Sequence, residues 1–295
     1  MTKSSTPVPT TWTVRDRVLS LQDHTLLMGI VNTTPDSFSD GGRYAAVEAA
    51  VAHGLAMWNQ GADIVDVGGE STRPGAESIS AVEEMSRVVP VIRDLVDQDV
   101  VVSVDTMKAE VASAAITAGA HIVNDVSALA DPEMATVCAT TGVGVVLMHM
   151  QGDPQTMQDD PQYEDVVAEV TAYLEDRAAM AERAGIGRSQ ICVDPGIGFG
   201  KTFDHNMDLL GGIDEIAALG YPVLVGASRK GFLGSILRDA GFETAADERD
   251  SATAATVALA IVSGASVVRV HNVGHALQAA RTADAMVRAS RRRIS

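Results

Sequence analysis

Aromatic residues are scarce in this chain: they make up 4% of its 295 residues, although hydrophobic residues together make up 46%. The hydrophobic fraction is ample for a buried core. A low aromatic content with abundant Ala and Val is typical of parallel α/β proteins. Barrels reach this length as single domains, although two ordinary domains would also fit.

The chain has only two cysteines and no long apolar run. Cys138 and Cys192 lie far apart without the spacing of a metal site, so we expect reduced, structural thiols. No apolar run approaches the length of a membrane span, and the opening segment "MTKSSTPVPTTW" lacks the apolar core of a signal peptide. We therefore expect a cytoplasmic protein that has no membrane partner.

Positive charge is in short supply. The chain has 22 Lys and Arg against 39 Asp and Glu, a formal net charge of −17. Nucleic acid is an unsuitable partner, because phosphate binding requires a basic surface. An anionic small substrate would need a local cluster of Arg, Lys or helix N-termini that overcomes the global field.

Short β-branched runs alternate with longer amphipathic segments along the whole chain. The eight runs are "LLMGIV", "ADIVDV", "VVVSVD", "AHIVND", "VGVVLM", "QICVD", "PVLVGAS" and "SVVRVH". Eight β-α units in this length predict a (β/α)₈ barrel, in which the strands close and leave no edge. A doubly wound open sheet is the alternative, but no dinucleotide-binding loop follows the first strand.

The segment before the first of these units has a different pattern. Residues 11–25, "TWTVRDRVLSLQDHT", alternate like a hairpin strand, and we expect them to plug the bottom of the barrel. We expect residues 1–10 to be disordered. The predicted organisation is thus an N-terminal extension over 1–24 and a single barrel domain over 25–295.

Polar residues stand at the carboxyl end of every predicted barrel strand, which is the face where barrel enzymes build their sites. In chain order they are Asn32, Asp66, Asp105, Asn124 with Asp125, His149, Asp194, Ser228 to Gly231, and Arg269 with His271. Taken singly, Asp66, Asp125 and His149 are best explained as helix N-caps or satisfied core residues. As a set, the polar ends indicate a site.

Arg269 and His271 stand two residues apart on one strand, so their side chains share a face. If that face points inward, a guanidinium and an imidazole can hold an anion at the barrel mouth. An internal ion pair of Arg269 with Asp105 or Asp194 is the structural alternative.

The stretch "GIGFGKT" is similar to the end of a phosphate-binding P-loop. Pro195 stands where that pattern requires Gly, so the P-loop is rejected. The glycines instead predict a backbone that passes close beneath a flat ligand.

Seven stretches together resemble the successive signatures of the dihydropteroate synthase family, in its order and spacing. They are "MGIVNTTPDSFSDGG", "DVGGESTRPGA", "SVDT", "VNDVSA", "DPGIGFGKT", "VGASRK" and "RVH", and the resemblance runs from about Leu27 to Val287. It implies a (β/α)₈ barrel that condenses hydroxymethyl-dihydropterin diphosphate with p-aminobenzoate to give dihydropteroate and diphosphate. It also implies Mg²⁺ as cofactor and a homodimer.

The resemblance further implies a role for individual residues. The pterin would be bound by Asp105, Asn124, Met148, Asp194, Phe199 and Lys230. The diphosphate would be bound by Asn32, Arg269 and His271, and Mg²⁺ by Asn32, with Asp36 and Asp40 as further candidates. The p-aminobenzoate would be bound by Phe38, Thr72, Arg73, Pro74 and Gly231. Catalysis would rest on Lys230, Arg269, His271 and Asp105.

Elementary chemistry agrees with these residue types. A dihydropterin presents a guanidine-like edge with adjacent N–H donors, for which the carboxylate of Asp194 is a suitable acceptor, while Asn124 can both donate and accept. Departure of diphosphate requires positive charge, which Arg269, His271 and Mg²⁺ supply. Because the conjugated dihydropterin can carry cationic character, a dissociative displacement needs no protein nucleophile.

The polar loop "NTTPDSFSDGG" would act as a lid in which Phe38 covers the incoming amine. Three positions depart from the usual family pattern: Thr33 replaces Val, Gly231 replaces a frequent Ser, and Asn272 replaces Asp. Gly231 removes a hydroxyl that could touch p-aminobenzoate. Two other functions remain open, a non-catalytic pterin-binding paralogue and a corrinoid-linked pterin methyltransferase domain.

Overall fold

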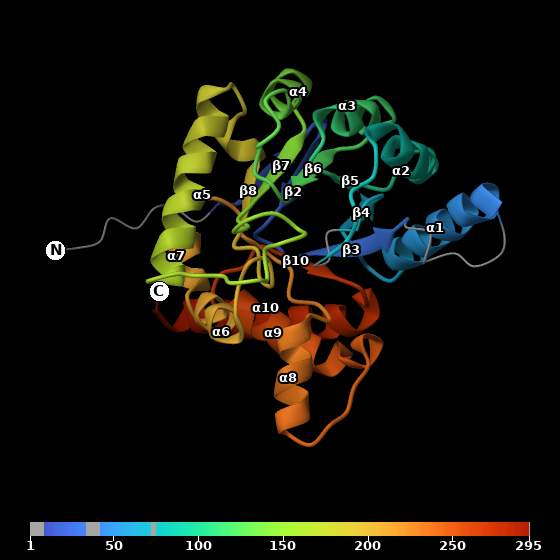
Figure 1. The fold of residues 1–295 in the computed structure, drawn as a ribbon. Coiled ribbons are helices and arrows are strands. Elements are labelled where there is room, and N and C mark those ends of the chain that lie inside the picture. Colours follow the sequence, from blue (N-terminus) through green and yellow to red (C-terminus); the bar gives the residue numbers. More distant parts are fainter. Residues whose placement is uncertain (1–8, 34–41, 72–74, 295) are drawn as a thin grey trace.

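The computed structural model describes residues 9–33, 42–71 and 75–294. Its centre is a sheet of eight parallel strands in the order β8, β7, β6, β5, β4, β3, β10, β9. A parallel bridge between Val193 and Val223 joins the two outermost strands and closes the sheet into a barrel (Figure 1). The strands are β3 Leu26–Asn32, β4 Ile64–Gly68, β5 Val102–Asp105, β6 Ile122–Asp125, β7 Gly144–Met148, β8 Ile191–Asp194, β9 Leu224–Val225 and β10 Val267–Val270. Closure confirms the predicted barrel and excludes the open doubly wound sheet.

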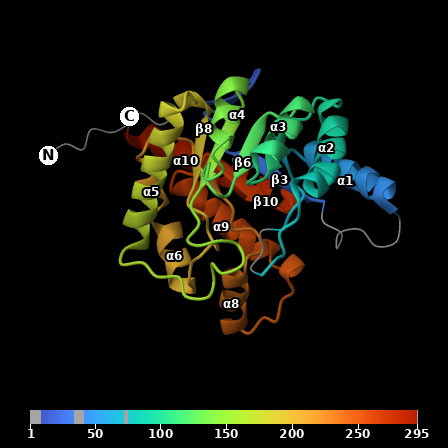
Figure 2. The ribbon, with the colours of Figure 1, turned by 45° about the horizontal axis from the view of Figure 1, so that its top comes forward.

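Helices cover the outside of the barrel, and α8 projects from its lower side in two views (Figures 1 and 2). They are α1 Gly42–Asn59, α2 Ala81–Val96, α3 Ala109–Thr117, α4 Met134–Thr141, α5 Val166–Arg183, α6 Phe203–Gly211, α7 Ile213–Ala217, α8 Gly231–Asp239, α9 Asp250–Val262 and α10 Val273–Ile294, with short 3₁₀ turns at Arg188–Gln190 and Ala246–Glu248. Several of these helices begin and end at residue types that favour helix termini. The side chains of Ser80, Asp165 and Thr202 cap α2, α5 and α6, and Gly142 ends α4 with φ of 73°.

Two apolar cores lie on the two sides of the closed sheet. The larger core fills the space between the strands and the surrounding helices. The smaller core lies inside the barrel and includes Met28, Ile64, Ile122, Cys192 and Val267. Because strand side chains alternate with a period of two, the residues two positions further along each strand also face the interior, and they lie nearer the carboxyl end. The barrel interior is therefore apolar at its amino-terminal end and has room for polar side chains at its carboxyl end.

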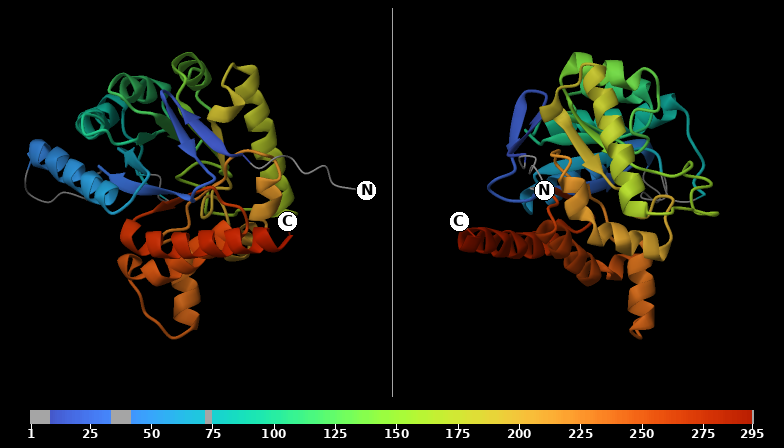
Figure 3. Two further views of the ribbon diagram at one scale, coloured as in Figure 1. Left: turned by 180° about the vertical axis from the view of Figure 1, so that it is seen from behind. Right: turned by 90° about the vertical axis from the view of Figure 1, so that its left-hand side faces the viewer.

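The expected N-terminal hairpin is present, and β1 Thr11–Val14 pairs antiparallel with β2 Arg17–Ser20. It lies across the barrel in the view from behind (Figure 3). Trp12 and Val14 are fully buried in the inner core, and the indole Nε1 of Trp12 donates to the carbonyl of Gln190 over 2.8 Å. A Cβ on Gly144, at the start of β7, would lie 2.5 Å from Val14, so this glycine permits the contact. The hairpin thus seals the amino-terminal end of the barrel.

Several other expectations can be compared with the described residues. Cys138 and Cys192 are both free and buried, and burial raises the pKa of Cys138 to about 12. None of the helices in the described ranges has the length and apolar character needed to span a membrane. The disorder expected for residues 1–10 concerns residues that, up to residue 8, lie outside the described ranges.

Replacing Trp12 with Ala should cost about 3–5 kcal/mol of unfolding free energy, because it opens a cavity in a closed core and removes a buried hydrogen bond. Urea unfolding followed by far-UV circular dichroism measures this cost. Val18→Ala in the same hairpin is the control, because Val18 is 66% exposed. A cost for Trp12→Ala no larger than that of the control would show that the hairpin does not support the barrel.

Candidate active site

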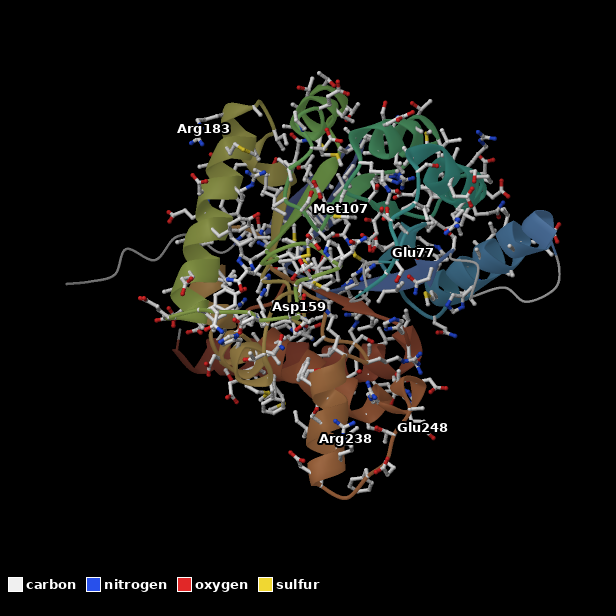
Figure 4. All side chains as sticks on the ribbon, viewed as in Figure 1. Glu77, Met107, Asp159, Arg183, Arg238 and Glu248 are labelled. Carbon is white, nitrogen blue, oxygen red and sulfur yellow. The ribbon has the colours of Figure 1, made fainter. Side chains whose placement is uncertain are left out.

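Five polar side chains converge inside the carboxyl end of the barrel. Figure 4 shows the described side chains on the ribbon of the whole molecule. Each of the five stands two or four residues after a member of the inner apolar core, as the period of a strand requires. Four of them are buried, and the fifth, Arg269, has a side chain that is 20% exposed. The five are Asp66 on β4, Asp105 on β5, Asn124 on β6, Asp194 on β8 and Arg269 on β10.

Arg269 binds two of the carboxylates in this group. Its Nε donates to Asp66 Oδ2 over 2.7 Å, and its Nη2 donates to Asp105 Oδ2 over 2.6 Å. The same Asp66 oxygen accepts from Asn124 Nδ2 over 3.0 Å. The ion pair expected as the structural alternative for Arg269 is therefore present, and it places the guanidinium inside the mouth.

Burial and charge oppose each other at Asp105. Burial raises the pKa of Asp105 to about 7, although the nearby Arg269 guanidinium works in the opposite direction. The pKa of Arg269 is raised by Asp66 and Asp105 in spite of its own burial. A carboxyl group that titrates near neutrality inside a barrel mouth is typical of a functional site.

Asp194 and Lys230 form a second part of the mouth. Asp194 Oδ1 accepts from the backbone N–H of Gly196 over 2.7 Å, and burial raises the pKa of this carboxyl group against the effect of that bond and of Lys230. Lys230 Nζ donates to the carbonyl of Ile197 and lies 4.1 Å from the ring centroid of Phe199. Burial lowers the pKa of Lys230 to about 7, with Asp194 opposing the shift.

The glycines of the loop after β8 allow this close packing. Gly198 has φ of 82°, and a Cβ there would lie 2.7 Å from Lys230 Cδ. The backbone thus passes close beneath the lysine that the sequence assigns to the pterin. Met148 is buried at the end of β7 and is the register partner of Asp194 on the neighbouring strand β8.

His271 and Asn32 stand beside this group. The backbone N–H of His271 donates to Ser228 Oγ over 3.2 Å, and His271 Nδ1 lies 3.0 Å from the same oxygen. Asn32 is the exposed last residue of β3, which pairs with β10. The structure therefore places Asn32 and Arg269 on the adjacent strands β3 and β10, and His271 directly after β10, at one end of the barrel.

A magnesium ion requires few protein ligands when its substrate carries phosphates. Among the described residues, no group of three or more His, Cys, Asp or Glu could hold a metal. Asn32 offers one side-chain oxygen at the mouth, and Asp36 and Asp40 lie outside the described ranges. The donors that are described fit a magnesium ion held mainly by a bound diphosphate.

Comparison with known proteins agrees with this geometry. The family model described as "Pterin binding enzyme" matches residues 28–271. The chain is 45% identical to dihydropteroate synthase of Escherichia coli (strain K12) over 267 residues, covering 90% of this chain and 93% of that protein. The chain belongs to the dihydropteroate synthase family of pterin-binding enzymes.

Other members of the family give the same result. Dihydropteroate synthase of Mycobacterium leprae is 48% identical over 266 residues, covering 89% of this chain and 94% of that protein. The solved structure of the Xanthomonas albilineans enzyme with 4-aminobenzoic acid superposes with a TM-score of 0.87 at 45% identity and covers 94% of this chain and 98% of that chain. The likeness therefore extends over nearly the whole barrel.

Two of the three departures from the usual family pattern have a structural explanation. The Thr33 hydroxyl donates to the carbonyl of Gly68 over 3.0 Å, a bond that valine could not make. Asn272 Nδ2 donates to Asp250 Oδ2 over 2.7 Å, where a second carboxylate would be repelled. A Cβ on Gly231 would meet nothing within 4 Å, so packing does not demand this glycine. Among the family's p-aminobenzoate positions, Phe38, Thr72, Arg73 and Pro74 lie outside the described ranges.

Sequence reasoning misjudged one residue, overlooked Lys201, and named Ser228 among the polar strand ends without assigning it a partner. Asp66 was expected to cap a helix, but its carboxylate binds Arg269 and Asn124 instead; the period of two from Ile64 is the signal that could have found it. Ser228 and Lys201 contact His271 and His149, and no local pattern marks those contacts. Asp125 accepts from the backbone N–H groups of Ser127 and Leu129 within its own loop, which is the local structural contact expected under its non-functional interpretation.

Replacing Arg269 with Met should destabilise the protein by about 3–5 kcal/mol, because it leaves buried carboxylates without a counter-ion. Burial raises the folded-state pKa of Asp105 to about 7, and loss of Arg269, which opposes that rise, would raise it further. A raised folded-state pKa stabilises the fold at low pH and loses that contribution as pH rises through it. The cost should therefore be constant at about pH 5 and grow as pH rises from about 6 through about 8, as measured by urea unfolding.

Arg229→Met provides the matched control. Arg229 makes a two-bond ion pair with Asp250, and this pair is the main cause that lowers the pKa of Asp250. That carboxyl group stays ionised over the same pH range, so the cost of removing Arg229 should not vary with pH there. An equal pH dependence for both variants would contradict the assignment of the titration to Asp105.

Proposed function

We propose that this chain joins hydroxymethyl-dihydropterin diphosphate to p-aminobenzoate, giving dihydropteroate and diphosphate. The observation that carries the proposal is the meeting of hydrogen-bonding groups for a flat heterocycle with cationic groups for an anion in one mouth. Asp194, Asn124 and Lys230 represent the first kind, and Arg269 and His271 the second. A related structure from Xanthomonas albilineans, 42% identical with a TM-score of 0.83, is a complex with 7,8-dihydropteroate.

The pterin would bind through Asp194, Asn124, Asp105 and Lys230. One oxygen of Asp194 accepts from Gly196, which leaves its remaining acceptor capacity for the guanidine-like edge of the pterin. Asn124 donates one N–H to Asp66, so its carbonyl oxygen is available to a donor on the ring. Met148 and Phe199 would supply the apolar contacts for the faces of the ring.

The diphosphate would bind beside Arg269, His271 and Asn32. A guanidinium carries five N–H donors, and the bonds to Asp66 and Asp105 engage only its Nε and Nη2. The remaining donors can receive the charge that develops as the bond from carbon to oxygen breaks. If the Ser228 hydroxyl donates to His271 Nδ1, the imidazole keeps a hydrogen on Nε2 as a further donor.

Bond formation needs no protein nucleophile. The bond between the methylene carbon and the diphosphate oxygen breaks, the dihydropterin ring shares the positive charge, and the amine nitrogen of p-aminobenzoate then bonds to that carbon and loses a proton. Asp105 and Lys230 would act by holding the electron-rich ring in place. Mg²⁺, held by Asn32 and the diphosphate, would neutralise charge on the leaving group when bound. Gly231, with Phe38, Thr72, Arg73 and Pro74, would surround the amine.

A coupled assay for diphosphate release, with and without p-aminobenzoate and Mg²⁺, tests this function. We expect release that depends on both. A non-catalytic pterin-binding paralogue would bind the pterin without release, and a corrinoid-linked methyltransferase domain would show no response to p-aminobenzoate. Either outcome would overturn the proposal.

Asp194→Asn should weaken binding of a pterin analogue by about 10- to 100-fold, because the amide turns one acceptor into a donor that faces ligand donors and leaves a buried group unpaired. Titration calorimetry measures the affinity directly. Asp214→Asn, an exposed change at the start of α7, should leave it unaltered. Unchanged affinity of Asp194→Asn would remove this carboxylate from the pterin site.

A homodimer would bury apolar side chains that α9 and α10 expose together. Leu259 and Val262, three residues apart on α9, are 67% and 57% exposed, and Met286 on the adjoining α10 is 62% exposed. Leu259→Lys should therefore shift the protein toward monomer in sedimentation velocity. Val18→Lys, an equally exposed position on the hairpin, is the control and should have no effect. A wild-type monomer at micromolar concentration would contradict the dimer.

A further inference from the structure

Lys201 is a buried lysine that no carboxylate in the described ranges pairs with. It is 3% exposed. Its Nζ lies 2.9 Å from the carbonyl oxygen of Phe199, 3.0 Å from His149 Nδ1 and 3.5 Å from the carbonyl oxygen of His149. An ammonium has three donors and no acceptor, and these three acceptors match it. A buried cation without a counter-ion is costly, so a specific reason for its presence is expected.

The three acceptors belong to two neighbouring loops. His149 follows β7, and Phe199 lies in the loop after β8, so Lys201 joins the two loops through its side chain. Two further bonds follow the same route: Tyr163 Oη donates to the carbonyl of Gly200, and Gln158 Nε2 donates to the carbonyl of Gly198, each over 2.9 Å. The side chains of Lys201, Tyr163 and Gln158 thus fix the backbone of the segment 196–200.

That segment is the support of Lys230. Its Ile197 carbonyl accepts from Lys230 Nζ, and its Phe199 ring faces the same ammonium. A displacement of the segment would therefore move two of the proposed pterin contacts together. The printed hydrogen bonds of Lys201 Nζ within the described residues go to His149 and to the backbone carbonyl of Phe199, so Lys201 acts on the site through this segment.

Lys201 also supplies charge to Asp194. Burial raises the pKa of Asp194, while the Gly196 N–H, Lys230, Arg269 and Lys201 all oppose that rise. In return, burial lowers the pKa of Lys201 to about 7, with Lys230 acting in the same direction and Asp194 opposing.

The other titratable groups against Lys201 do not supply this charge. Burial and Lys201 lower the pKa of His149 to about 3, so its imidazole is neutral at physiological pH. Tyr163, whose ring centroid lies 6.0 Å from Lys201 Nζ, has its pKa raised by burial and is neutral as well. Lys230, Arg269 and Lys201 are therefore the cations that act on Asp194.

We propose that Lys201 is a positioning residue of the pterin site, which fixes the segment 196–200 onto His149 and thereby holds the Gly196 N–H against Asp194 and the Ile197 carbonyl against Lys230. The inference rests on the proposed function for the identity of that ligand. A lysine that only supported the fold would affect stability alone.

Three substitutions of Lys201 separate hydrogen bonding from charge. Lys201→Met removes both, Lys201→Gln keeps donors without charge, and Lys201→Arg keeps both. We expect Lys201→Met to raise the KM for the pterin substrate about tenfold, the size expected for loss of hydrogen bonds from a charged group. The KM for p-aminobenzoate should not change.

The pH profile of kcat/KM for the pterin substrate gives the decisive readout. In Lys201→Met and Lys201→Gln the acidic limb should move to higher pH, because Asp194 then ionises later; in Lys201→Arg it should stay at the wild-type position. Arg15→Met is the matched control, because Arg15 also binds backbone carbonyls, those of Ile116 and Ala120, but at the sealed end of the barrel. It should leave both KM values and the limb unchanged.

An acidic limb that stays in place in both neutral variants would overturn the proposal, even if the proteins melt at lower temperature. If Lys201→Met does not fold, Lys201→Gln and Lys201→Arg decide the question by the same comparison. Calorimetry of hydroxymethyl-dihydropterin binding against pH repeats the test without turnover. A wild-type protein that releases no diphosphate would therefore refute the proposed function, whereas an unshifted binding profile would refute the role of Lys201.

Discussion

The alternation of side chains along a closed ring of parallel strands is the constraint on which the rest of this structure depends. Once the sheet closes, every second residue of each strand must point into a narrow interior, and its neighbours must point toward the helices. Apolar side chains fill the inward positions near the amino ends. Farther along the same strands, the inward positions carry Asp66, Asp105, Asn124, Asp194 and Arg269. Packing and chemistry are thus two ends of one periodic pattern.

Burying charge at those positions works against stability, and the mouth contains several ways of limiting the cost. Arg269 stands between two carboxylates, Asp194 accepts from a backbone N–H, and Lys230 is held by a carbonyl and an aromatic ring. None of these groups is fully neutralised, as the opposite shifts at Asp105 and Lys230 indicate. Under the proposed function, this residual imbalance would favour a ligand that brings both donors and negative charge. A protein with an excess of acidic residues can in this way attract an anion at one place.

The sequence was sufficient to predict the barrel, the hairpin at its base and the end at which polar residues gather, because each depends on local periodicity. The predicted group of Asp105, Asn124, Asp194, Lys230 and Arg269 does converge in the structure. Asp66 was misjudged because a single Asp after a strand is usually a cap, and only its place in the inward series distinguishes it. Lys201 and His149 are 52 residues apart, so their contact arises from the packing of neighbouring loops and leaves no mark in either segment. The favourable contact of Asn272 with Asp250 is equally non-local.

The plug formed by Trp12 and Val14 has a consequence for how ligands enter and leave the barrel. Because the hairpin seals the amino-terminal end, the described part of the barrel can be entered from the mouth alone, and a molecule that enters there must leave by the same opening. A flat ring seated deep against Asp194 would then be covered by whatever binds after it, and a second molecule arriving first would obstruct its path. Entry would follow a sequence, heterocycle before amine, and exit would reverse it, with the group nearest the surface leaving before the deepest one can move. In a barrel with one open end, the depth at which each ligand binds would thus set the order in which ligands bind and leave.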